Sequence, residues 1–204
     1  MAFEKISYPI LNLLSLLKQK IYCNVHNIIY MNDNPERIIL KNPKIEIDIV
    51  RINKVDNLCE YYQVPQIRRV FTKFKYFIRQ GVVIYLAIHN NNVVGHYLIT
   101  KLVNFKPYLY NNHQIFSKPP NKNIYYIFYC NTFKKYRGNG IYPYMLAKMS
   151  EDVFQGDKNA VVYISTEITN IPSQKGIEKV GFKKVARLKY LQIGLITKKE
   201  VENV

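Results

Sequence analysis

The chain has no tryptophan and three cysteines in 204 residues, and its 14 acidic residues are outnumbered by 30 basic ones. An odd number of widely spaced cysteines without a CxxC pair gives neither a disulfide framework nor a zinc site, and fits a reducing cytoplasm. The histidines show no HExxH-like grouping, so we expect no metal. The cysteines are Cys23, Cys59 and Cys130, and the histidines are His26, His89, His96 and His113.

Long apolar runs are also missing. The apolar stretch from Tyr8 to Leu17 is interrupted by Asn12 and Ser15, and it is shorter than the roughly 18 residues that a membrane-spanning helix needs. Lys18-Gln19-Lys20 follow it, where a signal peptide would have small residues for cleavage. We therefore expect no membrane span, a cytoplasmic location, and an amphipathic helix that extends to about residue 22.

The excess of basic residues gives a net charge of +16 and a pI of about 9.6. A positive surface attracts anionic partners, which include nucleic acids, anionic membranes and small polyphosphates such as coenzyme A. No basic tail or arginine-rich arm stands apart from the apolar pattern, which argues against a nucleic acid as the partner. With 48% hydrophobic and 22% charged residues, the chain can form the core of one domain over residues 1–204.

Hydrophobic periodicity and turn residues predict strands first, followed by a β-α-β-α-β-β order. A long Pro- and Asn-rich loop over 103–122 is expected to be functional. We expect an α/β sandwich built on a mixed sheet. The expected strands cover 24–30, 45–49, 82–89, 93–101, 123–132, 160–169, 183–188 and 190–196, and further helices cover 65–80, 140–153 and 172–180.

The strongest local signal is a glycine-rich turn between an expected strand and an expected helix, which reads Arg137-Gly138-Asn139-Gly140-Ile141-Tyr142. Glycines without a Cβ let backbone N–H groups approach a ligand, and a helix start adds partial positive charge and unpaired donors. The turn therefore favours a pyrophosphate. Its spacing fits neither a dinucleotide fingerprint nor a P-loop.

Residues 123–182 resemble the GNAT superfamily of N-acetyltransferases, whose cofactor motif is Arg/Gln-x-x-Gly-x-Gly/Ala. Arg137 and Gly140 match this motif, whereas Tyr142 stands where Gly or Ala is usual. A second family element, which is an Asn, a small residue and a Gly-Phe pair, is matched in spacing by Asn170, Ser173 and Gly181-Phe182. The resemblance also covers the expected hairpin over 82–101, with Gly95 at a frequent family position, and fades before residue 45. It implies a GNAT-like mixed central sheet flanked by helices, with an N-terminal extension over 1–44 and a core over 45–204.

The resemblance implies acyl-coenzyme A as co-substrate, held between the strands 123–132 and 160–169. Backbone groups near Cys130 and Thr132 would hold its pantetheine arm and polarise the thioester carbonyl. Asn170 and Ser173 would contact the far end of the cofactor. The N–H groups that would bind its pyrophosphate are those of Gly138, Asn139, Gly140, Ile141 and Tyr142.

The residues for acid–base chemistry are left open. Ile177 stands where many family members have a Tyr that protonates the departing thiolate. Either another hydroxyl serves, or the thiolate leaves without a dedicated acid, because a thiol pKa near 8.5 makes it a good leaving group. Glu167, near a strand end, is the first candidate for the base, and His96, after Gly95, is the second. A neutral amine could also attack without any protein base.

Local similarity of the segments 137–144 and 173–179 points to the branch that acylates nucleotide-linked amino sugars for surface polysaccharides. A basic, Tyr-rich cleft covered by the loop 103–122 suits such an anionic, aromatic acceptor. Other amines, such as an antibiotic or a protein N-terminus, stay open, as does a protein that binds acyl-CoA without catalysis. The sequence is silent on the oligomeric state. The loop residues concerned are Lys106, Tyr108, Tyr110, His113 and Lys118.

Overall fold

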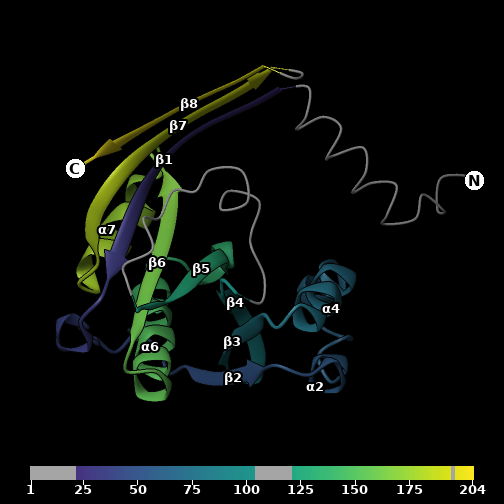
Figure 1. The fold of residues 1–204 in the computed structure, drawn as a ribbon. Coiled ribbons are helices and arrows are strands. Elements are labelled where there is room, and N and C mark those ends of the chain that lie inside the picture. Colours follow the sequence, from purple (N-terminus) through teal and green to yellow (C-terminus); the bar gives the residue numbers. More distant parts are fainter. Residues whose placement is uncertain (1–21, 104–120, 194–195) are drawn as a thin grey trace, which may run out of the picture.

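The computed structural model describes residues 22–103, 121–193 and 196–204, which form an eight-stranded sheet in the order β2-β3-β4-β5-β6-β1-β7-β8 (Figure 1). The α/β class and the mixed central sheet with flanking helices are confirmed. The strands are β1 (Tyr22–Asn32), β2 (Asp48–Ile52), β3 (Val83–His89), β4 (Asn92–Lys101), β5 (Asn123–Thr132), β6 (Ala160–Glu167), β7 (Lys183–Ile193) and β8 (Ile196–Asn203). The helices are α2 (Val55–Cys59), α3 (Pro65–Arg68), α4 (Phe71–Arg79), α6 (Ile141–Gly156) and α7 (Ile171–Lys179), with 3₁₀ turns η1 (Pro35–Arg37) and η2 (Lys134–Tyr136).

The strands β5 and β6 run parallel, and the other neighbouring strands pair antiparallel. Parallel neighbours need a crossover connection, and α6 provides it. Alternate residues of a strand face opposite sides of the sheet. Tyr85 and Ala87 of β3 accordingly pack in the cluster that contains α6, whereas Ile84 and Leu86 pack with α2, α3 and α4. The two sets of helices therefore cover opposite faces of the sheet.

The expected strand over 24–30 is present as β1, and it lies inside the sheet. It pairs with β6 on one side and with β7 on the other. Ile28, Ile29 and Tyr30 are at most 5% exposed and belong to the core. The sheet therefore includes a strand from the N-terminal side of the boundary expected at residue 44.

Three expectations about element bounds were wrong. The strand expected over 45–49 runs instead from Asp48 to Ile52, as β2. The helix expected over 65–80 is two helices, because the backbone at Val70 leaves the helical region with φ −112° and ψ 3°. The last strand pair was expected to turn at Lys189, but β7 continues to Ile193. The segment around Lys189 has no turn-forming residue, and pairing with the long strand β1 extends β7 along its whole length.

Some expectations lie outside the described residues. These are the helix over the first 21 residues and most of the loop 103–122, including the five residues expected to cover the acceptor. The structure describes this loop at residue 103 and again from residue 121.

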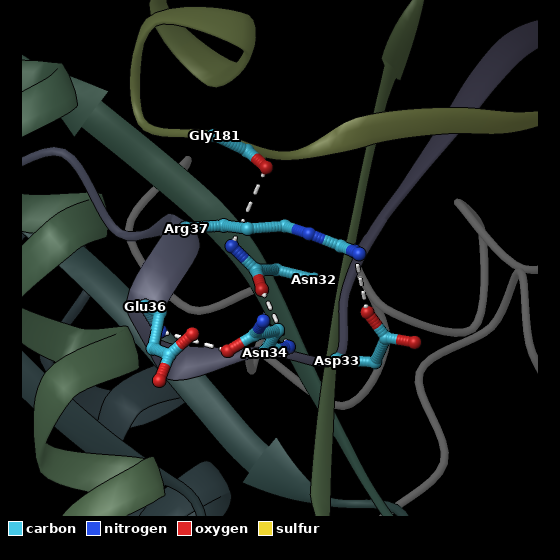
Figure 2. A network of polar contacts seen from close by, with 6 residues as sticks. All are labelled: Asn32, Asp33, Asn34, Glu36, Arg37 and Gly181. Carbon is cyan, nitrogen blue, oxygen red and sulfur yellow. Dashed lines mark hydrogen bonds and ion pairs between the residues drawn. The ribbon is translucent and has the colours of Figure 1, made fainter.

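Gly181 lies between the end of α7 and the start of β7, and it contacts the turn after β1 (Figure 2). Asn32 is fully buried and donates its side-chain N–H to the Gly181 carbonyl at 3.4 Å. A Cβ at Gly181 would overlap the carbonyl oxygen of Arg37, and the residue has φ +95°. Both features require glycine here, and they explain the glycine of the Gly-Phe pair by packing.

We expect Gly181→Ala to destabilise the fold by more than the about 1–2 kcal/mol that a left-handed alanine costs, because the new Cβ also displaces the Arg37 carbonyl. Urea unfolding followed by circular dichroism measures the change. Gly156→Ala, at the end of α6 with open space around it, is the matched control and should change the free energy of unfolding by less than about 1 kcal/mol. Equal stability of the two variants would contradict this account of Gly181.

Candidate active site

The parallel strands β5 and β6 pair over only part of their length. Pairing runs from Asn123 opposite Ala160 to Ile127 opposite Ile164. Both strands continue, β5 to Thr132 and β6 to Glu167, and they diverge in Figure 1. One edge of β5 after Ile127 therefore has no β6 partner. An extended ligand could pair along this edge, since backbone donors and acceptors need partners.

A β-bulge distorts β5 at the same place. Phe128 lies opposite Leu98 and Asn131 lies opposite His96, so the β5 strand carries an extra residue in this interval. Tyr129 has φ +49°, which is an unusual backbone for a residue with a large side chain. Bulges re-aim side chains and backbone groups, and they are frequent beside functional sites. The distortion begins where the pairing with β6 ends.

The Tyr129 ring is held between two side chains. The Lys73 ammonium, from α4, lies 3.8 Å from the ring centroid. The His96 ring, from β4, stacks on Tyr129 with centroids 5.4 Å apart. A cation over a tyrosine face contributes about 0.5–2 kcal/mol, so these contacts help to hold the strained residue. Neither Lys73 nor Tyr129 was predicted, because a bulge and a positive φ at tyrosine leave no sequence signal.

His96, a candidate base, is 4% exposed and lies against Phe74 and Phe133. Its Nδ1 has no hydrogen-bond partner among the described residues. Burial, with a smaller contribution from the Lys73 charge, lowers the pKa of His96 to about 4. The ring is therefore neutral at pH 7 and a weak base.

This pKa predicts a pH dependence of stability. The unfolded chain binds a proton at His96 below about pH 6.5, whereas the folded chain resists it down to about pH 4. Stability is therefore present above pH 6.5 and is lost as the pH falls from 6.5 towards 4. When the pH falls from 7 to 4.5, the free energy of unfolding of His96→Phe should decrease by about 2–3 kcal/mol less than that of the wild type. Urea titrations at both pH values measure this difference, and parallel losses would show that His96 is not responsible.

Glu167, the other candidate base, is the last residue of β6, and its side chain is exposed. Its backbone carbonyl accepts hydrogen bonds from the Asn170 N–H at 3.0 Å and the Gln174 side chain at 3.4 Å. It lies opposite Asn27 of β1, beyond the last residue of β6 that pairs with β5. The start of α7 therefore fixes the Glu167 backbone next to the unpaired part of the strands and leaves its carboxylate accessible.

The glycine-rich turn follows β5 as expected. Gly138 and Gly140 have φ +82° and +78°, and the turn is tied to β5 by Arg137, whose Nε donates to the Thr132 carbonyl at 2.9 Å. Gly140 is the N-cap of the 16-residue helix α6, without a capping side chain from the described residues. No backbone carbonyl of those residues accepts from the N–H groups of 138–142. This arrangement fits a phosphate, since it combines free donors with the positive helix end.

The other residues expected at the cofactor lie near the end of β5 and at the start of α7. Asn170 caps α7 by accepting the Ser173 N–H at 3.2 Å. The buried Thr132 hydroxyl bonds to the Tyr97 hydroxyl at 2.6 Å. Cys130 is partly buried, and burial raises its thiol pKa to about 12, so it is a packing residue and no nucleophile. Contacts of these residues with the cofactor stay a prediction.

The sequence matches the model of the acetyltransferase (GNAT) family over residues 49–182. The chain belongs to this family. None of the curated proteins matches it by sequence. The GNAT family uses acyl-CoA as co-substrate, and the turn after β5 offers a site of the right kind for its pyrophosphate.

Solved structures with the same fold include three acetyltransferase-related chains. The GNAT-family acetyltransferase of Colwellia psychrerythraea has a TM-score of 0.50 at 16% identity, over 89% of this chain and 61% of that one. A tandem GNAT protein from the clavulanic acid biosynthesis pathway has a TM-score of 0.55 at 11% identity, over 98% of this chain and 61% of that one. The GCN5-related N-acetyltransferase of Kribbella flavida has a TM-score of 0.52 at 8% identity, over 88% of this chain and 63% of that one. At these identities the likeness concerns the fold alone, and the chain spans about three fifths of their length.

The described part of the chain offers neither a membrane-spanning helix nor a cluster of metal ligands. No helix there is long and apolar enough to cross a membrane. Within the same residues, no group of three His, Cys, Asp or Glu side chains could hold a metal ion.

The turn of this GNAT chain gives a direct test of the phosphate site. A valine at Gly140 is strained at φ +78° by about 1–2 kcal/mol or more, so the backbone should rotate and displace the N–H groups of the turn. We expect Gly140→Val to bind CoA at least about tenfold more weakly by calorimetry, with an unchanged circular dichroism spectrum. Gly156→Val, in open space at the other end of α6, should bind CoA like the wild type. Equal affinity in both variants would refute the assignment of the turn.

Proposed function

We propose that this chain transfers an acyl group from acyl-CoA to an amine. The observation that carries the proposal is the glycine turn after β5, which no side chain of the described residues caps, directly after the part of β5 that does not pair with β6. An extended pantetheine arm could pair with the free edge of β5, and the turn could hold the pyrophosphate. Family membership supports the same cofactor.

For the base we propose Glu167. Its carboxylate is exposed at the end of β6, whereas His96 is buried among aromatic rings with a lowered pKa. An exposed carboxylate can accept the proton of the attacking amine directly or through a water molecule. The amine would otherwise need to arrive neutral, with positioning as the main contribution of the protein.

For the acceptor we propose an amino sugar linked to a nucleotide diphosphate. The net charge of +16 favours an anionic acceptor, and the Lys73 ammonium beside Tyr129 places one of these charges next to the bulge. A polycationic amine such as an aminoglycoside would be repelled. The local similarity of the segments 137–144 and 173–179 to enzymes of this branch supports the same class.

One observation favours a second function, which is binding of acyl-CoA without catalysis. Ile177 occupies the position of the family's usual acid, and it is fully buried in the core. A chain that retains the phosphate turn but catalyses no transfer would show CoA binding by calorimetry and no release of CoA thiol with any amine.

The acceptor class is tested by inhibition. Release of CoA thiol from acetyl-CoA is measured with a set of nucleotide-linked amino sugars, and dTDP and UDP are added without a sugar. We expect at least one of these nucleotides to compete with the acceptor, because the diphosphate supplies the charge that the basic surface attracts. An uncharged amino sugar of the same ring size is the control and should be a poor substrate. Failure of both nucleotides at millimolar concentration would exclude this acceptor class and leave the family's chemistry on another amine.

A further inference from the structure

The glycine turn before α6 is contacted by a segment from a distant part of the chain. Residues 38–47, which we call the strap, follow the 3₁₀ turn η1 and lead from β1 to β2 (Figure 1). The Lys44 N–H donates to the Asn139 carbonyl at 2.9 Å. The Pro43 Cα lies 3.6 Å from the position that a Cβ at Gly140 would take. The strap precedes residues 49–182, which match the family model, so the family's motif does not account for this contact.

The strap is anchored on both sides of its contact with the turn. On one side, the Ile39 N–H donates to the carbonyl of Val180, at the end of α7, at 3.2 Å. On the other side, Ile45 and Ile47 pack against the core cluster that contains α6. The proline at position 43 also restricts the backbone between these anchors. A segment fixed in this way can hold the turn in one conformation.

The carbonyl that accepts from Lys44 belongs to the same peptide group as the Gly140 N–H. A trans peptide is planar, so its C=O and N–H point in opposite directions, and the described residues contain no cis peptide bond. Glycine at position 140 would otherwise allow this plane to rotate easily. The bond from Lys44 therefore directs the Gly140 N–H away from the strap. No backbone carbonyl of the described residues accepts from this N–H, so it is available to an anion.

The next peptide group is fixed by α6 itself. The Gly140 carbonyl accepts the Tyr144 N–H at 3.2 Å, which is the first hydrogen bond of the helix. The Ile141 N–H, in the same peptide, therefore points out of the helix start. Two consecutive N–H groups are thus oriented by separate hydrogen bonds. The helix sets the direction of the Ile141 N–H, and the strap sets that of the Gly140 N–H.

The strap also carries two exposed basic side chains, Lys41 and Lys44. An exposed ammonium attracts a phosphate through charge, and salt screens this attraction. The hydrogen bond to Asn139 comes from the backbone and does not depend on the side chain at position 44. Variants can therefore separate a contribution of charge from a contribution of backbone orientation.

We propose that the strap orients the Gly140 N–H toward the pyrophosphate of acyl-CoA, and that the backbone N–H of Lys44 fixes this orientation. The inference rests on the acyl-CoA binding of the proposed function. Lys44 is a positioning residue, because it acts through the peptide between Asn139 and Gly140. A donor that is oriented before the ligand arrives does not have to be ordered on binding. The strap should therefore strengthen the binding of CoA.

The test compares three variants by calorimetry with CoA. Lys44→Pro removes the N–H and should bind CoA about tenfold more weakly, because the hydrogen bond of Gly140 to a charged group is misdirected. Lys44→Ala keeps the N–H and should bind CoA at least about fivefold more tightly than Lys44→Pro. Lys41→Pro is the matched control, since the Lys41 N–H donates to no backbone carbonyl of the described residues, and it should bind like the wild type. Pantetheine, which lacks the diphosphate, should bind equally to all of these proteins.

A second measurement uses the wild type alone. Coupling between two sites is reciprocal, so CoA should stabilise the strap contact as much as this contact stabilises bound CoA. Hydrogen exchange followed by NMR should show that the Lys44 amide exchanges about tenfold more slowly when CoA is saturating. The amide of Asp157, which donates to the Val153 carbonyl at the other end of α6, is the control and should exchange at an unchanged rate.

The outcomes separate this inference from the proposed function. Equal losses of CoA affinity in Lys44→Pro and Lys44→Ala would assign the effect to charge, and equal losses in Lys44→Pro and Lys41→Pro would assign it to a general disturbance of the strap. Each result would overturn the inference, and so would wild-type affinity in Lys44→Pro. An unchanged exchange rate at Lys44 would also overturn it, even if Lys44→Pro does not fold. If the wild type shows the expected coupling but acylates no amine, the proposed transfer fails and the role of the strap stands.

Discussion

The parallel contact between β5 and β6 and its end at Ile127 and Ile164 determine most of the candidate site. Beyond this point each strand is held by its outer neighbour. β4 still pairs with β5 as far as Thr132, and β1 still pairs with β6 as far as Glu167. The pairing of β5 with β6 therefore ends while both strands remain part of the sheet.

The same contact places the helix that would bind phosphate. A parallel pair requires a crossover, and α6 begins at Ile141, directly after its N-cap Gly140 and nine residues after Thr132 ends β5. The bond from Arg137 to the Thr132 carbonyl keeps the turn next to the strand end. Donors at the start of α6 and the edge of β5 therefore face one region. A ligand with an anionic end and an extended polar arm matches that arrangement better than a compact one.

Much of this was predictable because local signals and tertiary structure agree. The bounds of β5 were predicted to the residue, and the hairpin of β3 and β4 follows from alternation around three asparagines, two of which adopt positive φ. The motif spacing found α6, α7 and the Gly181 junction. What failed depends on distant partners. Pairing with β1 sets the length of β7, and the bulge at Tyr129 is visible only against β4.

The position of Tyr142 shows how a departure from a motif can be accommodated in three dimensions. A large ring where the family has a small residue would be expected to block the start of α6. Gly176, 34 residues later, removes the side chain that the ring would meet, and Ser173, one helical turn earlier, bonds to its hydroxyl. The sequence around Gly176 does not explain this residue, since a glycine within α7 lowers helix propensity. The explanation lies in the other helix, so Tyr142, Ser173 and Gly176 are best understood as one structural unit that joins α6 to α7.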